Sequence, residues 1–274
     1  MPVLQIDGVE LYYELEGEGP AVVLVHAGIT DARMWDDQFQ EFAGRHSVLR
    51  YDIRGYGRSS LPGGSYSLAG DLRDLLQTLG IERAALVGVS LGGRVALELA
   101  LLEPRLVTAL VLVGSGMPDH NWSDEVKEIG EAEDEALDRG DVDTAVQLNL
   151  DLWVAGPGRT LDDVDPKVVE RVREMQRDAF VTQVAAYKAD PPPGPGGGVD
   201  PPVGSRLGEI AVPTLVLVGE EDVQDIREIS NRLAREIPGA RKVVIRRTAH
   251  VPNMEKPAEF NVLVLDFLAS IDGG

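Results

Sequence analysis

The sequence has 274 residues, enough for one or two domains, and 43% of them are hydrophobic, so a buried core is expected. With 46 acidic and 26 basic residues the net charge is −20, which argues against nucleic acid or a membrane surface as a partner, because both favour basic patches. The absence of cysteine excludes disulfides, thiolate nucleophiles and cysteine-ligated zinc. No stretch resembles a secretory signal or a membrane span, so we expect a soluble, cytoplasmic protein.

The chain opens with a predicted hairpin and continues with short apolar runs. Residues 3–6 and 9–15 flank Asp7-Gly8, which is a strong two-residue turn signal. Unbroken runs rich in valine and leucine are typical of strands that are buried on both faces of a parallel sheet. Such runs, the weaker ones included, occur at Ala21–Val25, Val48–Tyr51, Ala84–Val89, Ala109–Val113, Thr214–Val218 and Val243–Ile245.

Helical periodicity fills the intervals between these runs. Leucines recur at helical spacing from Leu68 to Leu79, with Ser67 as the predicted N-cap and Gly80 as the stop. Further helices are predicted over 91–103, 225–237 and 257–269. Strands that alternate with helices at this spacing predict an α/β fold with a mainly parallel sheet.

Residues 117–210 interrupt the alternation and contain 21 acidic but only 9 basic residues. They show helical patterns and no predicted strand, so we interpret them as a helical domain inserted between two strands of the sheet. The core domain then comprises 1–116 and 211–274. The helical patterns within the insert cover roughly 124–139, 141–155 and 165–189.

The end of this insert is rich in proline and glycine. Residues 191–204 hold 6 prolines and 5 glycines, a composition that predicts no regular element. Two interpretations stay open: a passive surface linker, or a lip that moves as substrate enters.

The segment Gly88-Val89-Ser90-Leu91-Gly92-Gly93 lies between a predicted strand and a predicted helix. This is the context in which a G-x-S-x-G turn forms a nucleophile elbow. The turn is so tight that a side chain at position 88 or 92 would collide with neighbouring backbone. The serine is held in strained geometry that lifts its hydroxyl out of the sheet, above a helix N-terminus with partial positive charge. Ser90 is the predicted nucleophile.

With this turn the chain resembles the α/β-hydrolase superfamily, and within it the small capped serine esterases and enol-lactonases. The resemblance implies an eight-stranded, mostly parallel sheet flanked by helices, with a helical cap inserted after the sixth strand. A second segment, Asp52-Ile53-Arg54-Gly55-Tyr56-Gly57-Arg58-Ser59, resembles the D-x-R-G-x-G-x-S turn of the family and is interpreted as scaffolding. Haloalkane dehalogenases and epoxide hydrolases are disfavoured, since they carry aspartate at the nucleophile position.

A serine nucleophile requires a general base, and the superfamily order is serine, acid, histidine. Of four histidines, His250 follows the last predicted strand. The acid is expected after the strand that ends at Val218, where the family spacing favours Asp222. Asp225 is the next candidate, or a helix cap, and Asp119 would serve if the acid had moved to the sixth strand.

The oxyanion of the tetrahedral intermediate needs two fixed N–H donors. One is predicted to be the backbone N–H of Leu91, directly after the nucleophile. The turn His26-Ala27-Gly28-Ile29 resembles the His-Gly-x turn of the family, which implies Gly28 as the second donor and Ile29 as the alternative one residue further on. Ala27 departs from the usual glycine. We interpret His26 as structural, its ring bridging backbone groups of this loop.

The remaining candidates concern the substrate. Trp122 and Trp153 of the insert, with Ile29, Trp35 and Val251 near the catalytic turns, are the predicted substrate-binding residues. A mostly apolar roof over an oxyanion hole suits a small ester or lactone. No metal or organic cofactor is expected, and both a monomer and a homodimer stay open.

The resulting prediction is a serine hydrolase that cleaves a carboxylic ester or lactone through an acyl-enzyme, with Ser90, Asp222 and His250 as its triad. The same triad also serves carbon–carbon bond hydrolases and cofactor-free perhydrolases, which remain alternatives. A third alternative is a non-catalytic receptor for a small ligand, because fold alone does not fix function.

Overall fold

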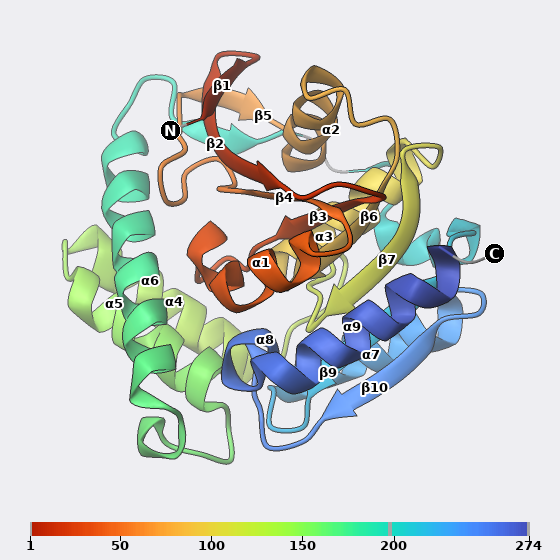
Figure 1. Cartoon of the computed structure of the whole chain (residues 1–274). Helices are drawn as coiled ribbons and strands as arrows, with labels where there is room; N and C mark the ends of the chain where they lie inside the picture. Colours follow the sequence, from red (N-terminus) through yellow and green to blue (C-terminus); the bar gives the residue numbers. More distant parts are fainter. Residues whose placement is uncertain (1, 197–198, 273–274) are drawn as a thin grey trace.

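A computed structural model describes residues 2–196 and 199–272 of the chain and contains one large sheet (Figure 1). Its eight strands follow the order β1-β2-β4-β3-β6-β7-β9-β10. The β1–β2 and β2–β4 pairs are antiparallel, and every other pair in this sheet is parallel. This arrangement confirms the predicted fold. The strands are β1 Val3–Ile6, β2 Val9–Glu16, β3 Ala21–Val25, β4 Ser47–Tyr51, β6 Ala84–Val89, β7 Val107–Val113, β9 Thr214–Gly219 and β10 Arg241–Ile245.

Helices cover both faces of the sheet. Residues of α2 (Leu68–Thr78), α3 (Leu91–Leu102) and α7 (Gln224–Glu236) share one hydrophobic cluster. Residues of α1 (Asp36–Ala43) and α9 (Pro257–Asp272) share a second cluster, and the short α8 (Pro252–Glu255) packs beside them. The two clusters lie on opposite faces of the same strands.

The strand β3 shows why the apolar runs are unbroken. Val23 and Val25 belong to one cluster, whereas Val22 and Leu24 belong to the other, and all four are buried. Successive side chains of a strand point to opposite faces, so a strand covered on both sides needs an apolar residue at every position.

The predicted turn and cap residues act as expected. Asp7 and Gly8 both have positive φ, 44° and 80°, as the tight hairpin between β1 and β2 requires. The Ser67 hydroxyl accepts a hydrogen bond from the Gly70 N–H at the start of α2, and Gly80 has φ 69° just after its end.

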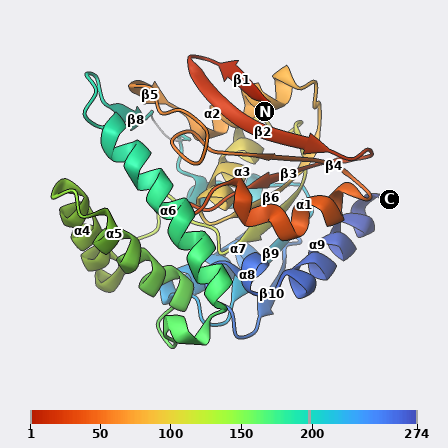
Figure 2. The ribbon, with the colours of Figure 1, turned by 60° about the vertical axis from the view of Figure 1, so that its left-hand side comes forward.

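The residues between β7 and β9 form three main helices that pack side by side on the flank of the molecule opposite the C-terminus (Figure 2). These are α4 (Asp124–Asp138), α5 (Val142–Asn149) and α6 (Pro166–Ala186), and a π-helical turn over Leu150–Ala155 continues α5. We call residues 117–210 the helical insert.

One expectation about the insert is wrong. A short strand, β8 (Pro193–Pro195), pairs in parallel with β5 (Gly64–Tyr66), although no strand was predicted in either segment. Proline lacks an N–H but keeps its carbonyl, and the Pro192 carbonyl accepts from the Gly64 N–H at 3.2 Å. The partner lies more than a hundred residues away, so local sequence gives no sign of it. Gly197 and Gly198 of the proline-rich segment lie outside the described residues.

In the described ranges no helix is both long and apolar enough to cross a membrane. The longest, α6, has 21 residues and carries Lys167, Glu170 and Arg171 in its first two turns. Across residues 2–196 and 199–272, no group of three or more histidine or acidic side chains is placed to hold a metal ion.

Candidate active site

Ser90 occupies a strained turn between β6 and α3. Its backbone has φ 53° and ψ −111°, a region that residues with a side chain rarely adopt. A Cβ at Gly88 would collide with the Gly92 carbonyl, and one at Gly92 would collide with the Val25 carbonyl. The serine therefore lies in the predicted strand–turn–helix context. The positions two residues before and two residues after it both require glycine.

Asp222 and His250 form a buried pair. The Nδ1 atom of His250 lies 2.9 Å from Oδ2 and 3.1 Å from Oδ1 of Asp222, and both side chains are almost fully shielded from solvent. Since an ionised carboxylate only accepts hydrogen bonds, Nδ1 carries the proton and Nε2 of the neutral ring is left as an acceptor. This is the tautomer that a general base for a serine hydroxyl requires.

The loop after β7 connects the serine to this pair. The Gly116 N–H donates to the Ser90 carbonyl at 3.0 Å. A Cβ on Gly114 would lie 3.2 Å from Asp222 Oδ2 and 3.3 Å from His250 Nδ1. The three predicted residues thus surround one loop, because β6, β7, β9 and β10 are neighbours whose carboxyl ends meet at the same sheet edge.

The two alternative acids have other partners. Asp225 accepts hydrogen bonds from His120 Nε2 (2.9 Å), the Ser123 N–H (2.8 Å) and the Ser123 hydroxyl (2.7 Å). Burial acts to raise the pKa of Asp225, but the hydrogen bonds from Ser123 and His120 outweigh it and leave the pKa below its usual value. Asp119 accepts from the Gly204 N–H and lies 3.8 Å from Arg232. Both carboxylates tie the ends of the helical insert to other parts of the fold.

The turn after β3 is fixed by His26. Its Nδ1 atom lies 2.8 Å from the Ala27 carbonyl, and its Nε2 accepts from the Ile53 N–H at 2.8 Å. Burial lowers the pKa of His26 to about 4, so the ring is neutral at pH 7. A Cβ at Gly28 would lie 3.7 Å from the Cβ of Leu91, so the two residues that carry the predicted oxyanion donors are neighbours.

The buried ring of His26 predicts a loss of stability at mildly acidic pH. Its pKa of about 4 lies below the ~6.5 of an unfolded histidine, so the unfolded chain takes up the proton first as pH falls. We expect this group to reduce the free energy of unfolding by up to about 1.4 kcal/mol per pH unit between roughly pH 6.5 and 4. Urea unfolding at pH 7, 6 and 5 measures this, and His26→Gln should show a shallower pH dependence. Identical slopes would contradict the prediction.

Two predicted substrate-binding residues lie close to the Asp222–His250 pair. The ring of Trp153 is 4.6 Å from the ring of His250, and its carbonyl accepts from the His250 N–H at 3.2 Å. Trp122 lies edge-on to Trp153, with ring centroids 6.4 Å apart. Both indoles are only half-buried, and Trp153 is carried by the π-helical turn, a distortion that is frequent at functional sites.

The other three predicted substrate-binding residues lie in the hydrophobic core. Trp35 is fully buried, with its ring 6.2 Å from that of Phe260, and Ile29 and Val251 belong to the same cluster. The structure therefore does not bring these side chains to the pocket described below. Closeness in sequence to a catalytic turn does not reveal on which side of the sheet a residue packs.

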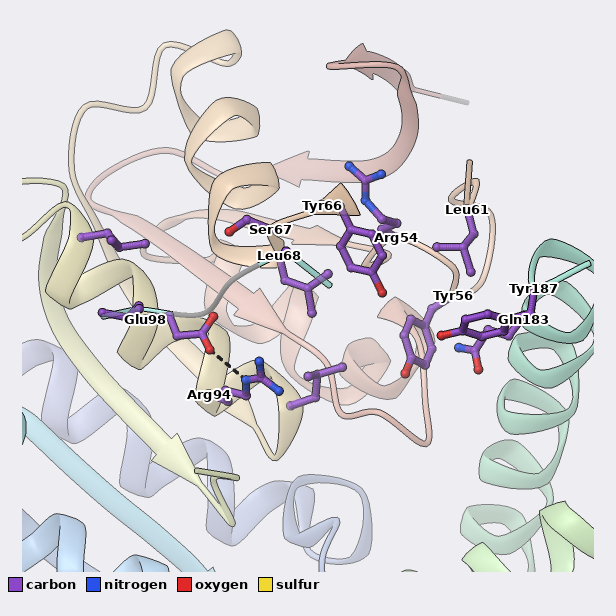
Figure 3. A pocket seen from close by; sticks show the side chains of 14 residues that line it. Arg54, Tyr56, Leu61, Tyr66, Ser67, Leu68, Arg94, Glu98, Gln183 and Tyr187 are labelled. Carbon is purple, nitrogen blue, oxygen red and sulfur yellow. Dashed lines mark hydrogen bonds and ion pairs between the residues drawn. The ribbon is translucent and has the colours of Figure 1, made fainter. Parts of the chain in front are cut away.

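A pocket of about 300 Å³ opens beside Leu91, between the core and α6 (Figure 3). Its walls combine tyrosine and leucine side chains with two ion-paired arginines. Arg94 donates from Nε to Glu98 at 2.8 Å, so its charge is paired. The lining residues are Arg54, Tyr56, Leu61, Tyr66, Ser67, Leu68, Leu91, Arg94, Glu98, Leu102, Gln183, Tyr187, Gly196 and Val199.

Most of this lining was missed by sequence reasoning. Only Arg54, Tyr56 and Leu91 belong to a recognised motif, and Arg54 is held by Asp71 at 2.6 and 2.8 Å with its guanidinium 4.8 Å above the ring of Tyr66. Tyr66 comes from β5 and Gln183 from α6. Residues this far apart in sequence carry no common signal that would have joined them.

The chain belongs to the alpha/beta hydrolase fold family, whose model matches residues 20–257. It is 32% identical to the putative carbamate hydrolase RutD of Variovorax paradoxus (strain S110), over 95% of this chain and 97% of that one. It is 28% identical to a putative 2-succinyl-6-hydroxy-2,4-cyclohexadiene-1-carboxylate synthase of Bacillus subtilis (strain 168), over 97% of each chain. The enol-lactonase from Burkholderia xenovorans LB400 superposes with a TM-score of 0.80 at 26% identity, covering 98% of this chain and all of the other. These relatives support a hydrolase.

Proposed function

We propose that the protein is a serine hydrolase that cleaves a carboxylic ester or a lactone through an acyl-enzyme intermediate. The observation that carries this proposal is the strained Ser90 turn and the buried Asp222–His250 pair, which both adjoin the loop after β7. A strained serine backbone is costly and persists where the surrounding fold holds it for a function. A buried histidine that is oriented by a carboxylate is the matching base.

In the proposed mechanism, Ser90 Oγ attacks the substrate carbonyl while His250 Nε2 takes its proton. Asp222 keeps the ring in the correct tautomer and stabilises the imidazolium that forms. The N–H groups of Leu91 and Gly28 donate to the oxyanion. His250 then protonates the leaving alkoxide, and a water molecule that His250 deprotonates attacks the acyl-enzyme to release the acid.

Two features support a small ester or lactone as substrate. The pocket of about 300 Å³ lies beside Leu91 and mixes apolar with hydrogen-bonding walls, which suits a compact and partly polar acyl or alcohol group. The similarity to an enol-lactonase extends over nearly the whole chain. Trp153 reaches His250 from the helical insert, so we further propose that the insert acts as a cap over the site.

Pre-steady-state kinetics with p-nitrophenyl acetate test the proposal. We expect a burst of p-nitrophenol close to one equivalent per protein, and an acetyl adduct on the peptide that contains Ser90 by mass spectrometry. A panel of p-nitrophenyl esters of increasing chain length beside several lactones then defines the substrate. Phosphonate labelling of Ser90 without turnover of any ester or lactone would favour a carbon–carbon bond substrate, and tight ligand binding without labelling would favour a receptor.

A further inference from the structure

The geometry points to the hydroxyl of Tyr56 as a third hydrogen-bond donor to the oxyanion, beside the N–H groups of Leu91 and Gly28. This inference rests on the proposed function and concerns the same site. Tyr56 belongs to the segment 52–59 that was interpreted as scaffolding.

The Tyr56 hydroxyl lies beside Gly28, the residue that carries one of the two predicted donors. A Cβ at Gly28 would be 3.6 Å from Tyr56 Oη and 3.7 Å from the Cβ of Leu91. Tyr56 and Leu91 also line the same pocket, so the hydroxyl borders the space that a bound acyl group would enter (Figure 3). A side-chain hydroxyl beside Gly28, in a pocket that Leu91 also lines, can share the negative charge that develops on the carbonyl oxygen.

The ring of Tyr56 is held by the residue that fixes the oxyanion turn. It packs edge-to-face against His26 with ring centroids 5.1 Å apart, and His26 in turn bonds to Ala27 and Ile53. The backbone is fixed as well, because the Tyr56 N–H donates to the Ile53 carbonyl and the Ser59 N–H donates to the Tyr56 carbonyl, each at 2.9 Å. Donors that are already in place need no reorganisation when the charge appears.

The hydroxyl proton remains available to a substrate. Burial raises the pKa of Tyr56 to about 12, and a hydrogen bond with Gln183 opposes this rise, as expected if the Gln183 amide donates to Oη. The phenol is therefore protonated at neutral pH, and its own proton can point into the pocket. Gln183 comes from α6 and also donates to the Gly55 carbonyl, so the helical insert helps to orient this donor.

Substitutions of tyrosine by phenylalanine, which remove only the hydroxyl group, test the inference. We expect Tyr56→Phe to lower kcat for a p-nitrophenyl ester about 10- to 100-fold, with KM within about twofold, because the bond forms mainly in the transition state. A trifluoromethyl ketone, which forms a tetrahedral adduct with the serine, should lose affinity by a similar factor. Tyr66→Phe, in the same pocket, should change KM rather than kcat. Tyr13→Phe, on β2 and outside the pocket, is the matched control and should behave as wild type in both assays.

The outcomes separate this inference from the proposed function. Acylation of Ser90 in wild type together with an unchanged kcat in Tyr56→Phe would overturn the Tyr56 assignment alone. A lower kcat without any loss of trifluoromethyl ketone affinity would also overturn it, as would an equal loss of kcat in Tyr66→Phe. Failure of wild type to acylate Ser90 would overturn both proposals. Thermal midpoints of all variants check that the folded state persists.

Discussion

Replacement of Ser90 by alanine is expected to lower kcat for ester hydrolysis about 10⁵-fold or more while the protein stays folded. The hydroxyl is the only group proposed to form a covalent bond with the substrate, and no cysteine is present to replace it. Ser90 makes no side-chain hydrogen bond as the N-cap residue of α3, so its hydroxyl contributes little to that helix. Steady-state rates with a p-nitrophenyl ester and the loss of the pre-steady-state burst measure the effect.

An exposed serine provides the control for this change. Ser205 lies in a short turn of the helical insert, where its hydroxyl donates to the Pro202 carbonyl. Ser205→Ala should keep both the burst and kcat. Full ester hydrolysis by Ser90→Ala would contradict the proposed acyl-enzyme mechanism. It would indicate that water attacks the ester directly.

Asp222→Asn is expected to lower kcat about 10⁴-fold at neutral pH. An asparagine in this place can donate to Nδ1 of His250, which would leave the proton on Nε2 and remove the acceptor for the serine proton. The side chain is nearly isosteric and the site is closely packed, so the fold should persist. The pH profile of kcat distinguishes a wrong tautomer from a misfolded protein, because the residual activity should rise as hydroxide replaces the missing base.

Asp225→Asn is the matched variant, three residues along the chain from Asp222. Asp225 holds His120 and Ser123, at the start of the helical insert, so its loss should cost roughly 1 to 3 kcal/mol of stability. Its effect on kcat should be much smaller than that of Asp222→Asn. A larger loss of kcat in Asp225→Asn than in Asp222→Asn would show that the acid had been assigned to the wrong carboxylate.

Local signals in the sequence determined the elements that form the fold and the residues that meet at its edge. Apolar runs suited to two-sided burial located the parallel strands from β3 onward, and Asp7-Gly8 located the hairpin before them. The Ser90 turn and His250 were found because each has a fixed place after a strand, and parallel strands bring their carboxyl ends to one edge. Both signals depend on residues that are close together in the sequence, so they can be recognised without the fold.

Only the tertiary structure decided which side chains surround the proposed nucleophile. Trp35 was expected at the substrate and instead packs against Phe260 in the core. The spacing of residues in a loop does not determine on which side of the sheet the loop packs. Tyr56 was expected to be scaffolding and instead lies beside Gly28 and lines a pocket together with Leu91. The pairing of β5 with β8 likewise joins segments that are far apart in the chain. The physical reason is the same in each case: contacts between distant segments depend on how the whole chain packs, whereas turns, caps and strand ends depend on neighbours in sequence.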